Sequence, residues 1–267
     1  MLEVVRDGCR LSYRVDGPPH ADALLLSNSL GTTHALWQPQ LDALSSVFRL
    51  IRYDTRGHGA SDAPAGPYTI DELGLDALAI LDAAGARTAH ICGLSLGGLT
   101  AMWLGIHSPD RVGSLILAST AARIGNALLW QERIELVGTS GVASLADVAM
   151  GRWFTNTFRD AHPDVVAGYH LMLASCHAEG YASCCAAIRD ADLRAAVGAI
   201  TAPTLVIAGT HDPVTPPADA EAVRARIRGA RVSLLDAAHL ANVEQAAAFN
   251  DSVIAFITQQ EQGRRHG

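Results

Sequence analysis

Lysine is absent from this sequence of 267 residues, so all 20 of its lysine-or-arginine positions are arginine. A lysine amine is needed for a Schiff base with pyridoxal phosphate or a ketone substrate, for a serine–lysine dyad, and for a Walker-type phosphate loop. The missing residue type therefore excludes these three chemistries at once.

Long apolar runs and a cysteine framework are also missing. Charge or glycine interrupts the longest apolar stretches, so none reaches the length of a membrane-spanning helix. The 5 cysteines are odd in number and form no Cys-x-x-Cys pair, and the N-terminus has no basic segment followed by an apolar one. We therefore expect a soluble protein of the reducing cytoplasm with no membrane partner.

Basic charge is scarcer than acidic charge. With 27 acidic residues against 20 basic ones, the net charge is -7, which argues against nucleic acid as a partner. An anionic substrate would need specific local arginines. The apolar share of 49% is enough for a sizeable core in one large domain.

Strand-like and helix-like stretches alternate along most of the chain, which predicts a mostly parallel sheet flanked by helices, an α/β fold. The predicted strands are residues 10–15, 23–27, 48–53, 90–92, 114–118, 204–208 and 232–235. The predicted helices of this part are residues 37–46, 70–84, 98–107, 218–227 and 243–257. For the second helix, Thr69 is a candidate N-cap and Gly85 a stop signal.

The middle of the chain has a different pattern. Residues 121–192 are mainly helical in pattern, without a clear strand. We expect residues 1–120 and 193–267 to form the sheet domain, and residues 121–192 to be inserted as a helical lid. The polar residues 259–267 are expected to fray.

A candidate nucleophile lies in a Gly-x-Ser-x-Gly pattern. Ser95 follows an apolar strand-like run and precedes a helix-like stretch, and Gly93 and Gly97 flank it. Such a sharp turn places the serine at positive φ and exposes it at a helix N-terminus. There the Leu96 amide can stabilise an oxyanion. The alternative is a glycine-rich turn with an incidental serine.

Two later loops supply an acid and a base. Asp212 and His239 each follow an apolar strand, and parallel strands end at one edge of a sheet, so both can meet Ser95 there. His239 would accept the serine proton, and Asp212 would fix the imidazole tautomer. His211 competes as base, but it lies beside Asp212 on the acid loop. The alternatives are that Asp212 only caps a helix and that His239 has no functional role.

A second oxyanion donor is expected in the loop after an early strand. Residues 24–31 fit this position, with the amide of Leu30 as donor. An ordinary turn that ends a strand is the alternative reading.

Taken together, these motifs resemble the α/β-hydrolase superfamily, whose members share the pattern at residues 54–59 and the serine elbow. The stretches 27–32, 120–125 and 152–155 look more specifically like those of the 3-oxoadipate enol-lactonases, although many relatives have His-Gly where this chain has Asn28 and Ser29. The resemblance implies hydrolysis of a five-membered enol-lactone to 3-oxoadipate, in aromatic breakdown, with no metal or organic cofactor.

Such a substrate carries a free carboxylate, for which arginine is the suitable partner. Arg123, Arg133 and Arg152 lie in the predicted lid and are candidates, with surface salt bridges as their alternative role. Trp130 and Trp153 are candidate walls of the pocket, with simple lid packing as the alternative.

Other functions remain open at this level. A broader carboxylesterase, a perhydrolase or a carbon–carbon bond hydrolase would use the same three residues, and a non-catalytic ligand receptor could share the scaffold. A metal site is not expected, because the histidines and cysteines of the lid match no common zinc spacing. The sequence also leaves a homo-oligomer open.

Overall fold

An eight-stranded sheet forms the centre of the computed structural model, which describes the backbone of residues 1–266 and the side chains of residues 1–263. The strands lie in the order β1-β2-β4-β3-β5-β6-β7-β8. The pairs β1–β2 and β2–β4 are antiparallel, and the remaining pairs are parallel, which confirms the predicted α/β architecture. The bounds are β1 (Leu2–Arg6), β2 (Cys9–Asp16), β3 (Ala23–Ser27), β4 (Arg49–Tyr53), β5 (Ala89–Leu94), β6 (Val112–Ala118), β7 (Thr204–Gly209) and β8 (Arg231–Leu235).

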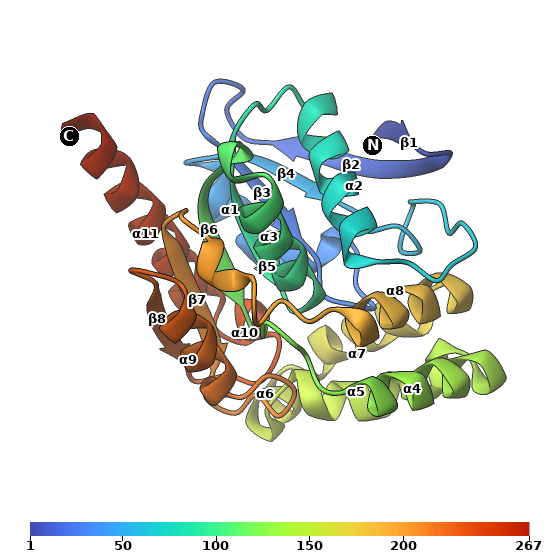
Figure 1. The fold of residues 1–267 in the computed structure, drawn as a ribbon. Coiled ribbons are helices and arrows are strands. Elements are labelled where there is room, and N and C mark those ends of the chain that lie inside the picture. Colours follow the sequence, from blue (N-terminus) through green and yellow to red (C-terminus); the bar gives the residue numbers. More distant parts are fainter. Residues whose placement is uncertain (267) are drawn as a thin grey trace.

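Helices cover both faces of the sheet. Figure 1 shows α2 and α3 in front of it and α1 and α11 behind it, while α9 packs on β7 and β8. Every residue of β3, β5, β6 and β7 is buried, as expected for parallel strands covered on both sides. These helices are α1 (Leu41–Ser45), α2 (Ile70–Ala83), α3 (Leu96–His107), α9 (Pro217–Arg226) and α11 (Ala246–His266).

A second layer of helices joins β6 to β7. Figure 1 shows it below the sheet, in light green to yellow. We call residues 121–192 the insertion; all of them are described, and they contain helices but no strand. Its helices are α4 (Ala127–Ser140), η3 (Val142–Leu145), α5 (Ala146–Trp153), α6 (Asn156–Ala161), α7 (Pro163–Ala174) and α8 (Ala178–Asp190).

The start of α2 agrees with the local sequence signal, whereas residues 37–46 do not form the single helix that the sequence predicts. Thr69 is the N-cap of α2, as the sequence predicted, and it also forms a capping box with Glu72. The predicted helix 37–46 is instead divided into η1 (His34–Gln40) and α1, because Pro39 cannot donate a backbone hydrogen bond. The remaining short helices are η2 (Pro109–Arg111), η4 (Val197–Ala199) and α10 (Ala241–Glu244).

The C-terminal segment also differs from expectation. The predicted helix 243–257 is divided between α10 and α11, and the expectation of fraying is wrong for residues 259–266, which continue α11. Gln and Glu in this stretch are good helix formers, and Arg231 donates to Gln259 at 2.6 Å. Gly267 lies outside the described residues. No helix in the described part of the chain has the length and apolarity to span a membrane.

Candidate active site

Ser95 lies at the sharp turn between β5 and α3. Its φ of 58° confirms the predicted positive value, which is strained for a residue other than glycine. Two contacts from the neighbouring strand end hold this turn. The Ser95 amide donates to the carbonyl of Ala118 at 2.9 Å, and the hydroxyl of Thr120 donates to the Ser95 carbonyl at 2.8 Å.

The two glycines beside Ser95 are required by close backbone contacts. A Cβ on Gly97 would lie 2.1 Å from the carbonyl oxygen of Ser27, and a Cβ on Gly93 would lie 2.0 Å from the carbonyl oxygen of Gly97. A side chain at Gly97 would therefore push the turn away from the end of β3, and one at Gly93 would push the first turn of α3 away from β5.

Asp212 and His239 meet at the ends of β7 and β8. Asp212 Oδ2 lies 2.8 Å from His239 Nδ1, and both side chains are buried. The amides of Val214 and Thr215 donate to Asp212 Oδ1. Burial raises the pKa of Asp212, but His239 and the hydrogen bonds from Thr215 outweigh it, so the pKa lies below its ordinary value. The carboxylate is therefore ionised at neutral pH, and His239 Nδ1 is the donor.

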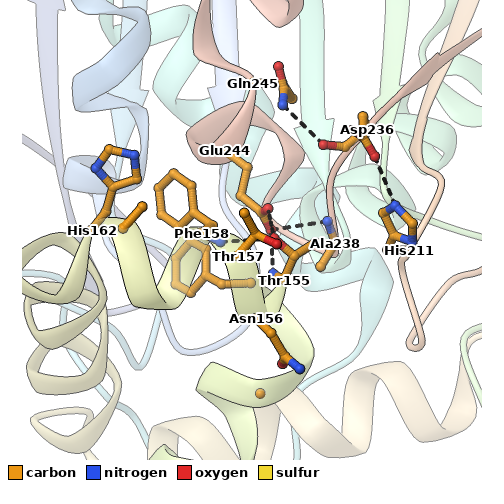
Figure 2. A pocket seen from close by; sticks show the side chains of 13 residues that line it. Thr155, Asn156, Thr157, Phe158, His162, His211, Asp236, Ala238, Glu244 and Gln245 are labelled. Carbon is orange, nitrogen blue, oxygen red and sulfur yellow. Dashed lines mark hydrogen bonds and ion pairs between the residues drawn. The ribbon is translucent and has the colours of Figure 1, made fainter.

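Ser95 and His239 line one cavity of about 550 Å³ under the insertion. Because Asp212 occupies Nδ1 of His239, Nε2 is the ring nitrogen left for proton exchange with a group in the cavity. The structure thus brings Ser95, His239 and Asp212 together from three separate loops. The competing base His211 is exposed, pairs with Asp236 at 2.8 Å and lines a different cleft (Figure 2).

The two expected oxyanion donors are the amides of Leu96, which directly follows Ser95, and Leu30. Leu96 is the first residue of α3, so its amide has no partner within the helix. Leu30 is buried and lines the cavity. Asn28 supports the Leu30 loop, since its side chain donates to the Tyr53 carbonyl at 2.6 Å and accepts from Trp37 at 2.8 Å.

His58 also supports the loop of residues 28–31 that contains Leu30. The sequence alone indicated no role for it. Its Nε2 accepts the amide proton of Gly31 at 3.0 Å, so Nδ1 carries the ring proton and faces the Arg56 carbonyl. Burial lowers the pKa of His58, while that carbonyl and Asp54 act in the opposite direction. The ring is therefore neutral at pH 7 and can serve as an acceptor. The glycine-rich pattern at residues 54–59 was the available signal.

Four of the five candidate substrate-binding residues line the cavity. Trp130, Arg133, Arg152 and Trp153 line the cavity, whereas Arg123 pairs with Asp192 at 3.3 Å and is not among the described residues that line it. The Arg133 guanidinium carbon lies 4.8 Å from the Trp130 ring centroid, a cation–π contact.

Two further lining residues, Tyr181 and Glu132, were not singled out from the sequence. Burial raises the pKa of the Tyr181 hydroxyl, and the nearby Arg133 opposes that shift. The cavity wall therefore combines aromatic surface with charges of both signs.

Within the described residues, no group of three or more histidine, cysteine, aspartate or glutamate side chains is arranged to hold a metal ion. Cys184 and Cys185 of the insertion are buried, and burial raises the pKa of both thiols, that of Cys185 to about 12. Both thiols are thus protonated at neutral pH and pack as apolar groups.

Comparison with known proteins places this geometry in a family. The family described as alpha/beta hydrolase fold matches residues 22–139, and the family described as TAP-like protein matches residues 172–266. The chain is 46% identical to 3-oxoadipate enol-lactonase 2 of Acinetobacter baylyi over 92% of each chain. It is 42% identical to 3-oxoadipate enol-lactonase 1 of the same organism over 94% of each.

A solved structure agrees with these relatives. The enol-lactonase from Burkholderia xenovorans LB400 superimposes with a TM-score of 0.95 at 44% identity, covering 96% of this chain and 100% of that one. Identity at this level over nearly the whole length includes the insertion as well as the sheet. The chain therefore belongs to the α/β-hydrolase superfamily and, within it, to the family of the 3-oxoadipate enol-lactonases.

Proposed function

We propose that this chain is a serine hydrolase that opens 3-oxoadipate enol-lactone to 3-oxoadipate through an acyl-enzyme. One observation carries the proposal: Ser95 and the Asp212-bound His239 line a cavity of about 550 Å³ in a chain 46% identical to an enol-lactonase. A cavity of this size suits a small molecule rather than a polymer.

The first half of the reaction forms the acyl-enzyme. Ser95 Oγ attacks the lactone carbonyl carbon while His239 Nε2 takes its proton, and Asp212 stabilises the resulting imidazolium. The amides of Leu30 and Leu96 hold the negative oxygen. When the ring C–O bond breaks, the leaving oxygen departs as an enolate, which is more stable than an alkoxide. Proton return from His239 and tautomerisation give the ketone.

The second half releases the product. Water enters the cavity, His239 removes one of its protons, and the resulting hydroxide attacks the ester carbonyl of the acyl-enzyme. Collapse of the tetrahedral intermediate breaks the bond to Ser95 Oγ, which recovers a proton from His239. The reaction consumes one water and uses neither a metal nor an organic cofactor.

The insertion would serve as the lid that selects the substrate. Arg133 is held by its Trp130 contact on the cavity wall, so we assign it the carboxylate of the lactone, with Arg152 as a second cation. Trp153 and Trp130 would form the apolar walls. Arg123 is a weaker candidate, because it is not among the described residues that line the cavity and it pairs with Asp192 at 3.3 Å.

Two expectations complete the proposal. The odd set of cysteines, all free in the structure, supports a reducing cytoplasm as the site of action. A homo-oligomer is compatible with the chain, and a sedimentation measurement would establish the assembly.

Kinetics with two substrates tests the assignment. Purified protein should hydrolyse synthesised enol-lactone with a kcat/KM well above that for p-nitrophenyl acetate, which lacks the carboxylate. Turnover of the aryl ester with the lactone untouched would contradict the lactonase proposal and favour a broader carboxylesterase, perhydrolase or carbon–carbon bond hydrolase. No turnover of either substrate, with ligand binding retained, would favour a receptor.

A further inference from the structure

The loop that carries His239 is attached to the insertion on both sides of the histidine. The amide of Leu240, just after His239, donates to the carbonyl of Trp153 at 3.0 Å. The amide of Ala238, just before it, donates to Glu244 Oε1 at 3.0 Å. Glu244 in turn accepts from Thr155, which lies two residues after Trp153.

Glu244 makes three hydrogen bonds with its one carboxylate. Besides Ala238, its Oε1 accepts from the Thr155 amide at 3.0 Å, and its Oε2 accepts from the Thr155 hydroxyl at 2.8 Å. Figure 2 shows this arrangement, with Glu244 between Thr155 and Ala238. Residues 153–155 belong to the insertion, whereas Glu244 ends α10 in the sheet domain. The carboxylate therefore bridges two layers of the fold.

Glu244 lies outside the cavity in which the substrate would bind. It lines a cleft of about 640 Å³ together with Ala238 and is not among the described residues that line the cavity of Ser95. Its influence on the reaction must therefore pass through the backbone that it holds.

We propose that Glu244 is a positioning residue that ties the peptide before His239 to residues 153–155, so that the base and the Trp153 wall of the cavity move as one unit. The bonds at Ala238 and Leu240 leave His239 little freedom to shift along its loop. A shift of about 1 Å of a base can cost on the order of 100-fold in rate, so this attachment matters for turnover. The inference rests on the proposed role of His239 as the base.

Four variants test the proposal. Glu244→Ala removes all three bonds, and we expect kcat to fall about 10- to 100-fold with KM within about twofold. Glu244→Gln should stay close to wild type, because its amide oxygen accepts the two backbone donors and its amide nitrogen donates to Thr155 Oγ1. Glu244→Asp is too short to reach both partners and should lose about tenfold in kcat. Glu221→Ala removes a surface glutamate paired with Arg224 on α9 and serves as the control.

The same variants are labelled at Ser95 with a fluorophosphonate, a reaction that needs the base but no lactone. Slower labelling of Glu244→Ala with rescue by Glu244→Gln is expected even if the lactone is not the substrate, which separates this inference from the proposed function. Labelling at the wild-type rate in Glu244→Ala, or a Gln variant as slow as the Ala variant, would overturn it. If Glu244→Ala does not fold, the Asp and Gln variants decide in the same way.

Hydrogen–deuterium exchange tests the coupling itself. In Glu244→Ala, the amides of residues 153–155 and 238–240 should lose protection together, and in Glu221→Ala they should keep it. Loss of protection in only one of the two segments would show that they do not move as a unit.

Discussion

The sheet and the insertion differ in how much of themselves they bury. All six residues of β5, which leads to Ser95, are buried, whereas α4, with 14 residues, buries only Trp130 and Val137. Apolar side chains of the insertion remain exposed at the cavity, among them Leu129 at 57% and Val148 at 58%. Ser95 thus follows a fully buried strand, whereas part of the cavity wall comes from exposed apolar side chains of the insertion.

This difference has a physical meaning. A catalytic arrangement has to be held within a fraction of an ångström, which strands packed on both faces provide. Segments with few buried contacts open more easily, which suits the entry of a substrate. Substitutions at the ends of the sheet strands should therefore lower kcat. Substitutions in the insertion should mainly raise KM.

The largest effect is expected from Ser95→Ala. Removing the attacking hydroxyl should lower kcat for the lactone by about 10⁴-fold or more, while affinity for the product is kept because the insertion is untouched. Steady-state kinetics and calorimetric binding of 3-oxoadipate measure the two quantities. Ser252→Ala on α11 is the matched control. Turnover of the lactone at the wild-type rate would show that Ser95 is not the nucleophile.

An intermediate effect is expected from Arg133→Leu in the insertion. Loss of a charge-assisted contact with the substrate carboxylate should raise KM about 10- to 100-fold with a small change in kcat. Hydrolysis of p-nitrophenyl acetate should be unaffected, because that ester carries no carboxylate. The matched variant Arg123→Leu, which breaks only a pair with Asp192, should change KM little. Equal KM values for both variants would reject the assignment of Arg133.

The smallest effect is a pH dependence of stability at His58. Its pKa in the folded protein is lowered by burial, so below the ordinary histidine value of about 6.5 the unfolded chain binds a proton more readily than the folded one. The free energy of unfolding is therefore not reduced by His58 above that pH, and it decreases as the pH falls below it, because the unfolded chain then gains a proton that the folded one does not. Urea unfolding at pH 7 and pH 5 should show a larger loss of stability in wild type than in His58→Gln. An equal loss would mean that His58 titrates normally.

Local sequence signals accounted for part of the fold and the site. The Gly-x-Ser-x-Gly pattern placed Ser95 at positive φ, and Thr69 located the start of α2, because both depend on residues within a few positions of one another. The edge strand β1 escaped detection, since its residues are mostly exposed and show little alternation. Pro39 is a local signal of the same kind, and it divides the segment that the apolar pattern predicts as one continuous helix.

Long-range contacts account for the rest. Nothing near Glu244 in the sequence indicates that it bonds Thr155, 89 residues away. The same holds for the hydrogen bond from Gly31 to His58 and for the pairing of Arg123 with Asp192. Before the chain folds, Arg123, Arg133 and Arg152 are equivalent arginines of the insertion, and only their neighbours in space distinguish them.

The sequence alone determined the class of fold and the types of residue for the chemistry, because apolar periodicity, glycine spacing and the order of serine, acid and histidine are local properties. The tertiary structure decided which side chains share a cavity, which arginine lies outside it and what holds the histidine loop. Those outcomes depend on burial and on partners brought together from distant segments, and no short stretch of the chain contains that information.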